Sequence, residues 1–226
     1  MKVLMINSVC GIRSTGRICT DLAEVLEKEG HTCKIAYGRE SVPEKYRKYA
    51  VRIGSDLGVK MHAGLSRIFD DAGFHSRFAT HKFIRWVKAY DPDVIHLHNI
   101  HGYYLNIEIL FDYLRTCGKK IIWTLHDCWA FTGHCSYFTY VGCEKWKTQC
   151  GHCVQKRGYP KSIFLDRSRQ NFERKKKLFT GIPNLTLVTP SKWLAGLVKE
   201  SSLNEYPVEV IHNGIDLTVF KPTPSD

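Results

Sequence analysis

The chain has 226 residues, a hydrophobic fraction of 43% and a formal net charge of +11. That length predicts one domain, or one large domain with an insertion. No stretch approaches the ~20 consecutive apolar residues that a membrane span needs. A secretory leader is not expected either, because the apolar run at residues 3–6 ends at Asn7. We therefore expect a cytoplasmic protein.

The positive charge is compatible with nucleic acid, with an anionic membrane surface or with a phosphorylated substrate. A solvated basic face is the simplest alternative. The basic residues are scattered, except for those gathered between Arg167 and Lys177. Since no nucleic-acid-binding motif is visible, we expect no nucleic-acid partner.

Apolar runs and helical periods alternate from the N-terminus. Residues 2–7 form a predicted strand, and a loop with glycines and hydroxyls follows at residues 11–16. The next helical period ends at Gly30 and places on one face Ile18, Leu22, Val25 and Leu26. Residues 32–37 are the next predicted strand. This strand–loop–helix–strand unit is typical of the start of a parallel sheet.

The alternation continues to the end of the chain. Further strands are predicted at residues 51–53, 94–97, 121–125, 185–189 and 208–211. Helices are predicted at residues 80–89 with Phe83, Ile84 and Val87 inward, at 107–116, from Ser162 to about residue 180, and from a Ser191 cap to about residue 200. Residues 57–73 are ambiguous.

This alternation predicts an α/β fold with a Rossmann-like, doubly wound parallel sheet. Ligands of such sheets sit at the carboxyl ends of the strands. We therefore expect one cleft to be formed by the loops that follow Asn7, Leu97, Leu125, Thr189 and Ile211.

The first of these loops precedes a helix N-terminus, where backbone N–H groups and the helix dipole favour an anion. Gly11 and Gly16 would allow close approach, and Arg13 or Arg17 could add charge. The loop is neither a P-loop nor a G-x-G-x-x-G fingerprint. We predict a phosphate or sugar contact here, and a plain turn is the alternative.

Histidines mark the ends of two predicted strands. His96, His98 and His101 surround the end of one strand and indicate a polar binding floor. His126 ends the next strand and precedes Asp127. A histidine that faces a cleft from a strand terminus can act as a general base or an electrostatic group. The alternative is a hydrogen-bonded polar residue without a chemical role.

Nine cysteines are many for a cytosolic chain, and five of them fall between Cys128 and Cys153. In a reducing compartment such a cluster indicates a metal before a disulfide. We predict a structural zinc ion held by Cys135, Cys143, Cys150 and Cys153, with Cys128, His134 and His152 as substitute ligands. A redox pair at Cys150 and Cys153, or simple buried thiols, are the alternatives. The small core residues are predicted to include Cys10, Cys19, Cys33 and Cys117.

Five segments in register resemble the N-terminal half of a family 4 glycosyltransferase. They are residues 2–16, 93–98, 124–127, 188–192 and 210–216. That family has the GT-B architecture, in which two Rossmann-like domains face each other across a cleft. The Cys-rich segment, residues 124–160, is similar to that of a subgroup of bacterial members that build polysaccharides.

The resemblance implies retaining transfer of a sugar from a nucleotide-sugar to an acceptor, with no metal in the chemistry. Residues 1–216 would form the acceptor-binding domain, with a Cys-rich insertion at residues 128–160. Residues 217–226 would begin a linker to a C-terminal domain that this chain lacks and that holds the nucleotide. We therefore expect the chain alone to be inactive.

The resemblance makes His126 the catalytic candidate, because it matches the family's histidine at the donor sugar or reacting centre. The residues expected to bind substrate lie in the converging loops and are Gly11, Ser14, Thr15, Gly16, Arg17, His98, Asn99, His101, Tyr103, Asp127, Ser191, Asn213 and Gly214. The single glycine at the start of the first loop departs from the commoner Gly-Gly of the family.

The expected partners are a nucleotide-sugar donor and a glycan or lipid-linked acceptor in cell-surface polysaccharide synthesis. A peripheral contact with an anionic membrane at its inner face is a further expectation. Two other functions stay open: a non-catalytic sugar- or nucleotide-binding module with structural zinc, and a basic nucleic-acid-binding zinc domain.

Overall fold

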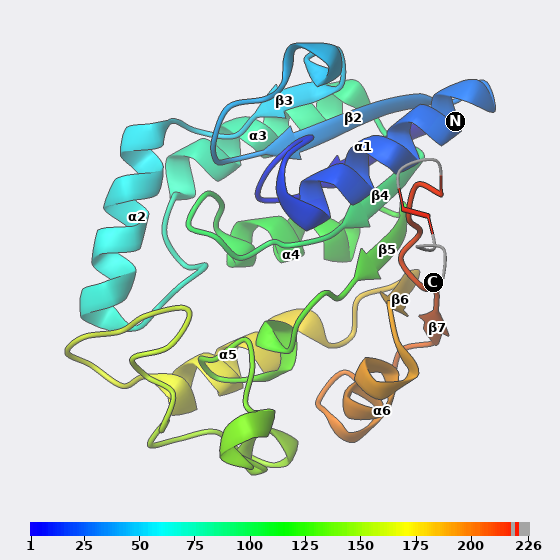
Figure 1. Ribbon diagram of the computed structural model, residues 1–226. Coiled ribbons are helices and arrows are strands. Elements are labelled where there is room, and N and C mark those ends of the chain that lie inside the picture. Colours follow the sequence, from blue (N-terminus) through cyan, green and yellow to red (C-terminus); the bar gives the residue numbers. More distant parts are fainter. Residues whose placement is uncertain (218–219, 222–226) are drawn as a thin grey trace.

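Seven parallel strands form one sheet in the computed structural model, which describes residues 1–217 and 220–221 (Figure 1). In chain order they are β1 (Lys2–Ile6), β2 (Thr32–Tyr37), β3 (Ala50–Arg52), β4 (Val94–Leu97), β5 (Lys120–Thr124), β6 (Leu185–Thr189) and β7 (Val208–Val210). Across the sheet the order is β3-β2-β1-β4-β5-β6-β7. The order reverses between β1 and β4, so the predicted α/β fold with a doubly wound parallel sheet is confirmed.

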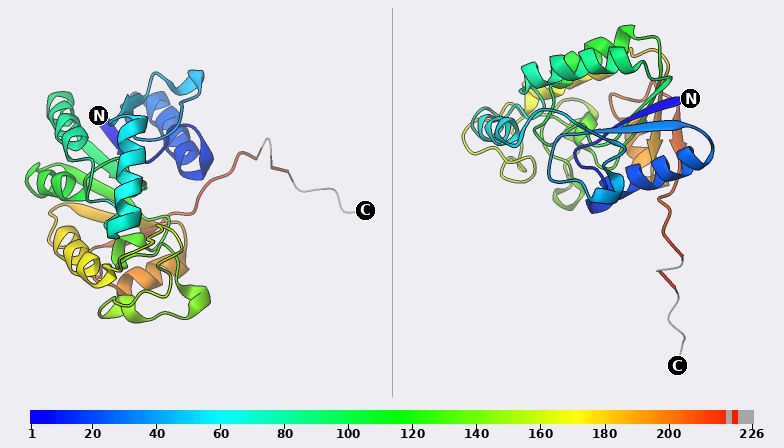
Figure 2. Two further views of the ribbon diagram at one scale, coloured as in Figure 1. Left: turned by 90° about the vertical axis from the view of Figure 1, so that its left-hand side faces the viewer. Right: turned by 90° about the horizontal axis from the view of Figure 1, so that it is seen from above.

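Six α-helices of the described chain surround this sheet. They are α1 (Arg13–Lys28), α2 (Asp56–Phe69), α3 (Arg77–Tyr90), α4 (Ile107–Thr116), α5 (Ser168–Phe179) and α6 (Lys192–Glu200). Figure 2 shows α1 and α6 on one face of the sheet and α3, α4 and α5 on the other. Helix α2 stands apart from both layers, beside the carboxyl ends of the strands.

Helix α2 occupies the segment that the sequence left ambiguous. It begins after Ser55, whose hydroxyl accepts a hydrogen bond from the Gly58 N–H at 3.2 Å. It ends at Asp70, which adopts the left-handed conformation. The helix buries only His62, Ala63 and Ser66, so most of its surface faces solvent.

The inward face of α1 differs from the prediction. Leu22 and Val25 lie on the exposed side, whereas Cys19 and Ala23 are buried. The helix also begins earlier than expected, at Arg13, and buries Gly16 in its first turn. Small side chains on the inward face let the helix axis lie close to the sheet, so the larger aliphatic residues turn outward.

The helix predicted from Ser162 begins six residues later, at Ser168. Ser162 is buried in the preceding loop, where its hydroxyl donates to the Leu165 carbonyl at 2.7 Å. Asp166 organises the turn into α5, because its Oδ1 accepts from the backbone N–H of Ser168 at 3.0 Å and from the hydroxyl at 2.6 Å. A local aspartate turn therefore replaces the predicted serine cap.

Each face of the sheet has its own core. On the α1 side, Met5 and Ile35 pack with the buried thiols Cys10, Cys19 and Cys33, as predicted for these three cysteines, whereas Cys117 is half-buried. On the other side, Trp123, Phe111 and Phe179 form an aromatic centre with ring centroids 4.4 to 5.5 Å apart. The inward positions predicted in α3, at Phe83, Ile84 and Val87, are confirmed.

The Cys-rich insertion folds on an extension of this second core. Its short 3-10 turns are η2 (Trp129–Phe131), η3 (Thr139–Val141) and η4 (Lys145–Lys147). Phe131, Phe138 and Trp146 are buried together, with centroids 4.9 to 6.4 Å apart. The insertion therefore has an apolar core made of aromatic side chains. Its sequence contains few aliphatic residues and did not indicate such a core.

The contact between Gly38 and Tyr104 provides a test of this packing. A Cβ atom at Gly38 would lie 2.0 Å from the Tyr104 Cβ, in a region that is fully buried. We expect Gly38→Ala to lower the free energy of unfolding by roughly 1–3 kcal/mol, the usual cost of overpacking. Chemical denaturation measures the change.

Gly64→Ala in α2 is the matched control, because an added Cβ meets no atom there within 4 Å. It should raise the free energy of unfolding by up to ~1 kcal/mol through helix propensity. Equal stability of Gly38→Ala and the parent protein would contradict the packing described.

Candidate functional site

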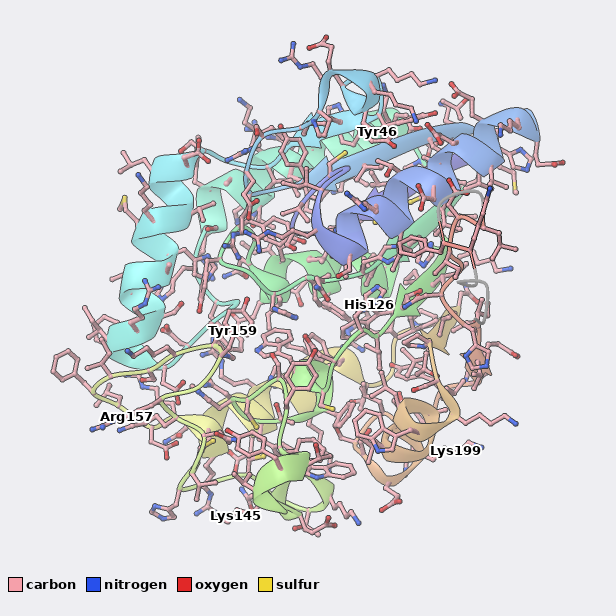
Figure 3. All side chains as sticks on the ribbon, in the orientation of Figure 1. Tyr46, His126, Lys145, Arg157, Tyr159 and Lys199 are labelled. Atoms are coloured by element: carbon pink, nitrogen blue, oxygen red, sulfur yellow. The ribbon has the colours of Figure 1, made fainter. Side chains whose placement is uncertain are left out.

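The unusual polar residues gather at the carboxyl ends of the central strands. Figure 3 shows His126 at the end of β5, with Tyr159 of the insertion on the side of α2. The loops after β1, β4 and β5 meet at this edge, although β4 separates β1 from β5. His126 and the loop of residues 11–16 are therefore not on neighbouring strands, and the β4 loop connects them.

A hydrogen bond between two histidines joins β4 to β5. His98 Nδ1 lies 3.1 Å from His126 Nε2, and the two rings are stacked with centroids 5.4 Å apart. His98 is 2% exposed, whereas His126 is partly open to solvent. The adjacent His96 places its Nε2 2.8 Å from the Thr124 hydroxyl. The inner histidine thus orients the outer one.

Burial keeps these imidazoles neutral. It lowers the pKa of His126 from 6.5 to about 4, and nearby Asp127 offsets only part of the effect. The pKa of His96 is also lowered to about 4, first by burial and then by His126. Burial holds the pKa of His98 well below its ordinary value. Neutral His126 can donate or accept a hydrogen bond at pH 7, but it is not a cation there.

A histidine–aspartate pair lies beside the two histidines. His101 Nε2 is 2.8 Å from Asp127 Oδ2, and Asp127 Oδ1 accepts from the Trp129 N–H at 2.9 Å. Burial alone would raise the pKa of Asp127, but these contacts outweigh it and the pKa lies below its ordinary value. Asp127 is therefore a carboxylate at neutral pH and adds a fixed negative charge next to His126.

One buried amide connects the first loop to the β4 loop. Asn7 is completely buried, and its side-chain NH₂ donates to the Val9 carbonyl at 2.8 Å and to the Thr15 hydroxyl at 3.2 Å. Its side-chain oxygen accepts from the Asn99 N–H at 3.2 Å. The position of the first loop is therefore set by side chains of the sheet edge.

The predicted anion-binding loop exposes only part of its residues. Gly11, Thr15 and Gly16 are buried, while Ser14 and Arg17 are exposed. At Gly11, which has a φ of +72°, an added Cβ would lie 2.5 Å from the Tyr46 ring. The glycines of this loop thus serve its tight turn, and its contact with phosphate or sugar stays a prediction.

The other predicted binding residues lie either in the loop after β4 or in the segments after β6 and β7. Asn99 is half-buried and Tyr103 is buried, with its ring centroid 6.5 Å from that of Tyr159. Ser191 caps α6, because its hydroxyl accepts from the Leu194 N–H at 3.2 Å. Asn213 and Gly214 are exposed after β7. The predicted linker, residues 217–226, lies mostly outside the described residues.

Arg39 is a site candidate that the sequence reasoning missed. It follows β2, its N–H donates to the Ser8 carbonyl at 2.9 Å, and its side chain lies against Gly102 in the β4 loop. It also lowers the pKa of Tyr103 and of Tyr159, against the larger effect of burial on both. The only signal in the sequence was its place after a strand, which several other residues share.

The cysteines of the insertion gather around one small cavity. Cys135, Cys143, Cys150 and Cys153 all line one cavity of about 30 Å³, together with His134 and His152. Yet among the described residues no group of three or more metal-ligating side chains is placed to hold an ion. The predicted zinc site is therefore not supported by the structure.

The cysteines and His134 have contacts with other groups that account for their placement around the cavity. Cys135 and Cys153 are paired by a hydrogen bond, which lowers the pKa of Cys153 to about 7 and raises that of Cys135. Cys150 accepts from the Gly133 N–H at 3.2 Å. Of the substitute ligands, His134 is bonded through Nδ1 to the buried Asp70 at 2.5 Å. Cys128 does not line the cavity.

Comparison with known proteins identifies the family. The family model "Glycosyltransferase Family 4" matches residues 15–219. The chain belongs to glycosyltransferase family 4. The putative colanic acid biosynthesis glycosyl transferase WcaC of Escherichia coli (strain K12) is 27% identical over 232 residues, which cover 96% of the chain and 55% of the relative. This family 4 chain thus spans about half the length of that relative.

Among solved structures, the glycosyltransferase VinC in complex with dTDP aligns with 84% of this chain and 49% of its own length. The identity is 13% and the TM-score is 0.39, so this similarity gives no information about the candidate site. Within the described residues, no helix combines the length and the apolar character that crossing a membrane requires.

The buried histidines predict acid sensitivity. His62, like His96 and His126, has its pKa lowered by burial, to about 3. In the unfolded chain these histidines take up protons near pH 6.5, whereas in the folded protein they do so only at lower pH. The free energy of unfolding should therefore fall between about pH 6.5 and pH 4.

Denaturant titrations at several pH values measure this slope. In His96→Gln the slope should correspond to about one proton fewer taken up on unfolding, because glutamine does not titrate. An identical slope in the parent protein and in His96→Gln would contradict the burial of neutral His96.

Proposed function

We propose that this chain is the acceptor-binding half of a retaining glycosyltransferase. The enzyme would move a sugar from a nucleotide-sugar to a glycan or lipid-linked acceptor of a cell-surface polysaccharide. Membership of family 4 supports the transfer of a sugar, and the printed name of the Escherichia coli relative supports the polysaccharide context. Most donor contacts would lie in the part of the relative that this chain does not span, and residues 1–226 alone would not transfer sugar.

The observation that carries this proposal is the neutral, partly open His126 at the end of β5. Its Nε2 faces His98, and no hydrogen bond from the described residues reaches its Nδ1. Nδ1 would therefore meet a hydroxyl of the donor sugar. With a pKa of about 4, His126 would not serve as a general acid at pH 7. Its role would be to hydrogen-bond the sugar as charge develops at the reacting carbon.

The neighbouring groups support an acceptor on the same edge. Asp127 is a carboxylate fixed by His101 and the Trp129 N–H. Tyr159 lies on the side of the edge that α2 flanks (Figure 3), and Arg39 lies close to Tyr159. Together they offer an anion, a cation and an aromatic ring at the same edge of the sheet, a set that suits a sugar with a charged or phosphorylated carrier.

Replacement of His126 tests the assignment in an intact enzyme that contains this chain. His126→Ala should lower kcat by roughly 10²-fold or more, the scale for a lost positioned polar group, with a smaller change in KM. His81→Ala, an exposed histidine on α3, is the control and should leave both constants unchanged. Wild-type turnover by His126→Ala, with the fold intact by circular dichroism, would exclude the proposed role.

We also propose that the insertion binds one structural zinc ion through Cys135, Cys143, Cys150 and Cys153. The spacing of these residues and the cavity that all four line support it. Coordination would require the thiols to move closer together and to lose their protons. The ion would have no part in the reaction.

Metal analysis of protein purified without chelators is the measurement. We expect about one zinc per chain and four sulfur ligands near ~2.3 Å by X-ray absorption. Cys150→Ser should lose most of the metal, and Cys117→Ser, outside the insertion, should keep it. Metal-free protein that is folded and as stable as zinc-treated protein would show that the aromatic core alone suffices.

A further inference from the structure

A line of polar contacts crosses the candidate site from the loop after β2 to the loop after β5. The Arg39 guanidinium lies within hydrogen-bonding reach of the Tyr159 oxygen. That oxygen lies 3.4 Å from His101 Nδ1, and His101 Nε2 lies 2.8 Å from Asp127 Oδ2. Four segments that are distant in the sequence therefore meet at the same edge of the sheet. We refer to Arg39, Tyr159, His101 and Asp127 as the Arg39–Asp127 network.

The two ends of the network fix the direction of the hydrogen bonds between them. A guanidinium can only donate and a carboxylate can only accept. Asp127 therefore requires a proton on His101 Nε2, and Arg39 occupies a lone pair of the Tyr159 oxygen. Burial raises the pKa of Tyr159 to about 12, so the phenol keeps its proton at pH 7 and can donate it to His101 Nδ1. His101 is then held as the tautomer that is protonated on Nε2.

Tyr159 reaches the network from the Cys-rich insertion. Its backbone carbonyl accepts from the Ser136 N–H at 3.1 Å, and the Ser136 carbonyl accepts from the Cys128 N–H at 3.0 Å. Cys128 directly follows Asp127, so these backbone bonds bring the end of the insertion back to its start. Although Tyr159 is 47% exposed, its hydroxyl is partly buried against His101.

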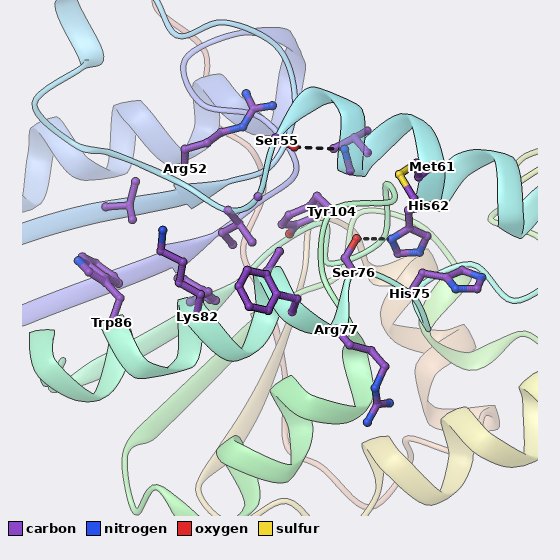
Figure 4. Close-up of a pocket in the computed structure, with 18 of the residues that line it drawn as sticks. Arg52, Ser55, Met61, His62, His75, Ser76, Arg77, Lys82, Trp86 and Tyr104 are labelled. Atoms are coloured by element: carbon purple, nitrogen blue, oxygen red, sulfur yellow. Dashed lines mark hydrogen bonds between the residues drawn. The ribbon is translucent and has the colours of Figure 1, made fainter.

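The ring of Tyr159 is supported from the side of α2. Its centroid lies 6.5 Å from that of Tyr103, and the Tyr103 centroid lies 5.7 Å from that of His62. His62 lines the groove between α2 and α3, where its Nδ1 lies 2.8 Å from the Ser76 hydroxyl (Figure 4). Its Nε2 accepts from the Gly73 N–H at 3.2 Å. The direction of the Tyr159 hydroxyl is therefore set by ring packing as well as by its polar contacts.

We propose that Tyr159 is a positioning residue of the transfer reaction. Its hydroxyl holds His101 in the tautomer that hydrogen-bonds Asp127, and this fixes the direction of the carboxylate that follows His126. The insertion thus contributes a side chain to the reacting edge, besides folding on its own aromatic core. The inference rests on the proposed function, because it gives Asp127 a task in sugar transfer. A fixed carboxylate stabilises positive charge as it develops at the sugar carbon.

Nitrogen chemical shifts of the His101 ring test the positioning without any reaction. In the 226-residue chain labelled with ¹⁵N-histidine, we expect Nε2 to carry the proton at pH 7 and Nδ1 to show the shift of a hydrogen-bonded acceptor. Tyr159→Phe removes only the hydroxyl, so Nδ1 should move downfield, toward the shift of a free acceptor nitrogen, while Nε2 stays protonated. Arg39→Gln should move Nδ1 in the same direction by less, because the hydroxyl is then less polarised.

Tyr140→Phe is the matched control, because it removes the same atom from the same insertion. Tyr140 is 78% exposed, and its hydroxyl donates to Gln155 Oε1 at 2.7 Å, outside the network. This variant should leave the His101 ring shifts and sugar transfer unchanged. Chemical denaturation shows whether each variant is folded. If Tyr159→Phe does not fold, Arg39→Gln tests the same contacts from the other end of the network.

Kinetics of an intact enzyme that contains this chain test the role in transfer. Tyr159→Phe should lower kcat roughly three- to tenfold, the effect of one hydrogen bond, with a small change in KM. In Asp127→Asn the further loss caused by Tyr159→Phe should be close to zero, because both substitutions act through the same carboxylate. A tyrosine that only stabilised the fold would give additive losses instead.

Three outcomes would overturn the positioning. The first is a His101 Nδ1 shift that Tyr159→Phe leaves unchanged, and the second is a parent protein in which Nδ1 carries a proton at pH 7. The third is additive loss of kcat in Tyr159→Phe and Asp127→Asn. The ring shifts are measured without substrate, so they test Tyr159 even if His126→Ala keeps wild-type turnover and the proposed function fails. Loss of turnover in His126→Ala, together with parent-like kinetics and ring shifts in Tyr159→Phe, would reject the positioning alone.

Discussion

The hydrogen bond between His98 and His126 fixes the geometry of the candidate site. His98 can orient the partly open ring of His126 because its own backbone is held on both sides. Its N–H donates to the Ile6 carbonyl at 2.9 Å, and its carbonyl accepts from the Trp123 indole N–H at 3.2 Å. Trp123 belongs to the aromatic core under the sheet. The orientation of His126 therefore depends on packing that lies a full layer below the surface. Because the same burial lowers the pKa of both histidines, geometry and protonation state have one cause.

Two further buried polar groups attach the surrounding segments to this centre. Asn7 joins the first loop and α1 to the β4 loop. Asp70, at the end of α2, accepts from His134 in the insertion and from the Arg167 N–H before α5, the latter at 2.7 Å. These side chains connect the first loop to the β4 loop and the end of α2 to the insertion. In such an arrangement the loops of the site are positioned by a few satisfied polar contacts, each of which is costly to break.

The sequence predicted the sheet well because each buried strand is a short apolar run between helical periods, as at residues 94–97 and 185–189. It also placed His126 just after a strand, as the structure does, while the role of His126 stays a prediction. It could not indicate that Leu22 and Val25 turn outward, because small residues on α1 allow closer packing than the hydrophobic period implies. It also missed Arg39, whose position beside Gly102 and Tyr159 arises only when β2 and β4 are placed on either side of β1. The predicted thiol ligands share one cavity, yet side-chain rotamers decide whether they meet, and spacing alone does not specify rotamers.

Titration of individual histidines by nuclear magnetic resonance tests the central claim most directly. With ¹⁵N-labelled histidine, the ring shifts of His126 should show a mostly neutral imidazole in one tautomer from about pH 7.5 down to about pH 5, since its pKa is about 4. In His98→Phe the hydrogen bond is lost, and the ring of His126 should then average over both tautomers at pH 7. The account is contradicted if His126 titrates near its ordinary pKa of 6.5, or if its tautomer is the same with and without His98.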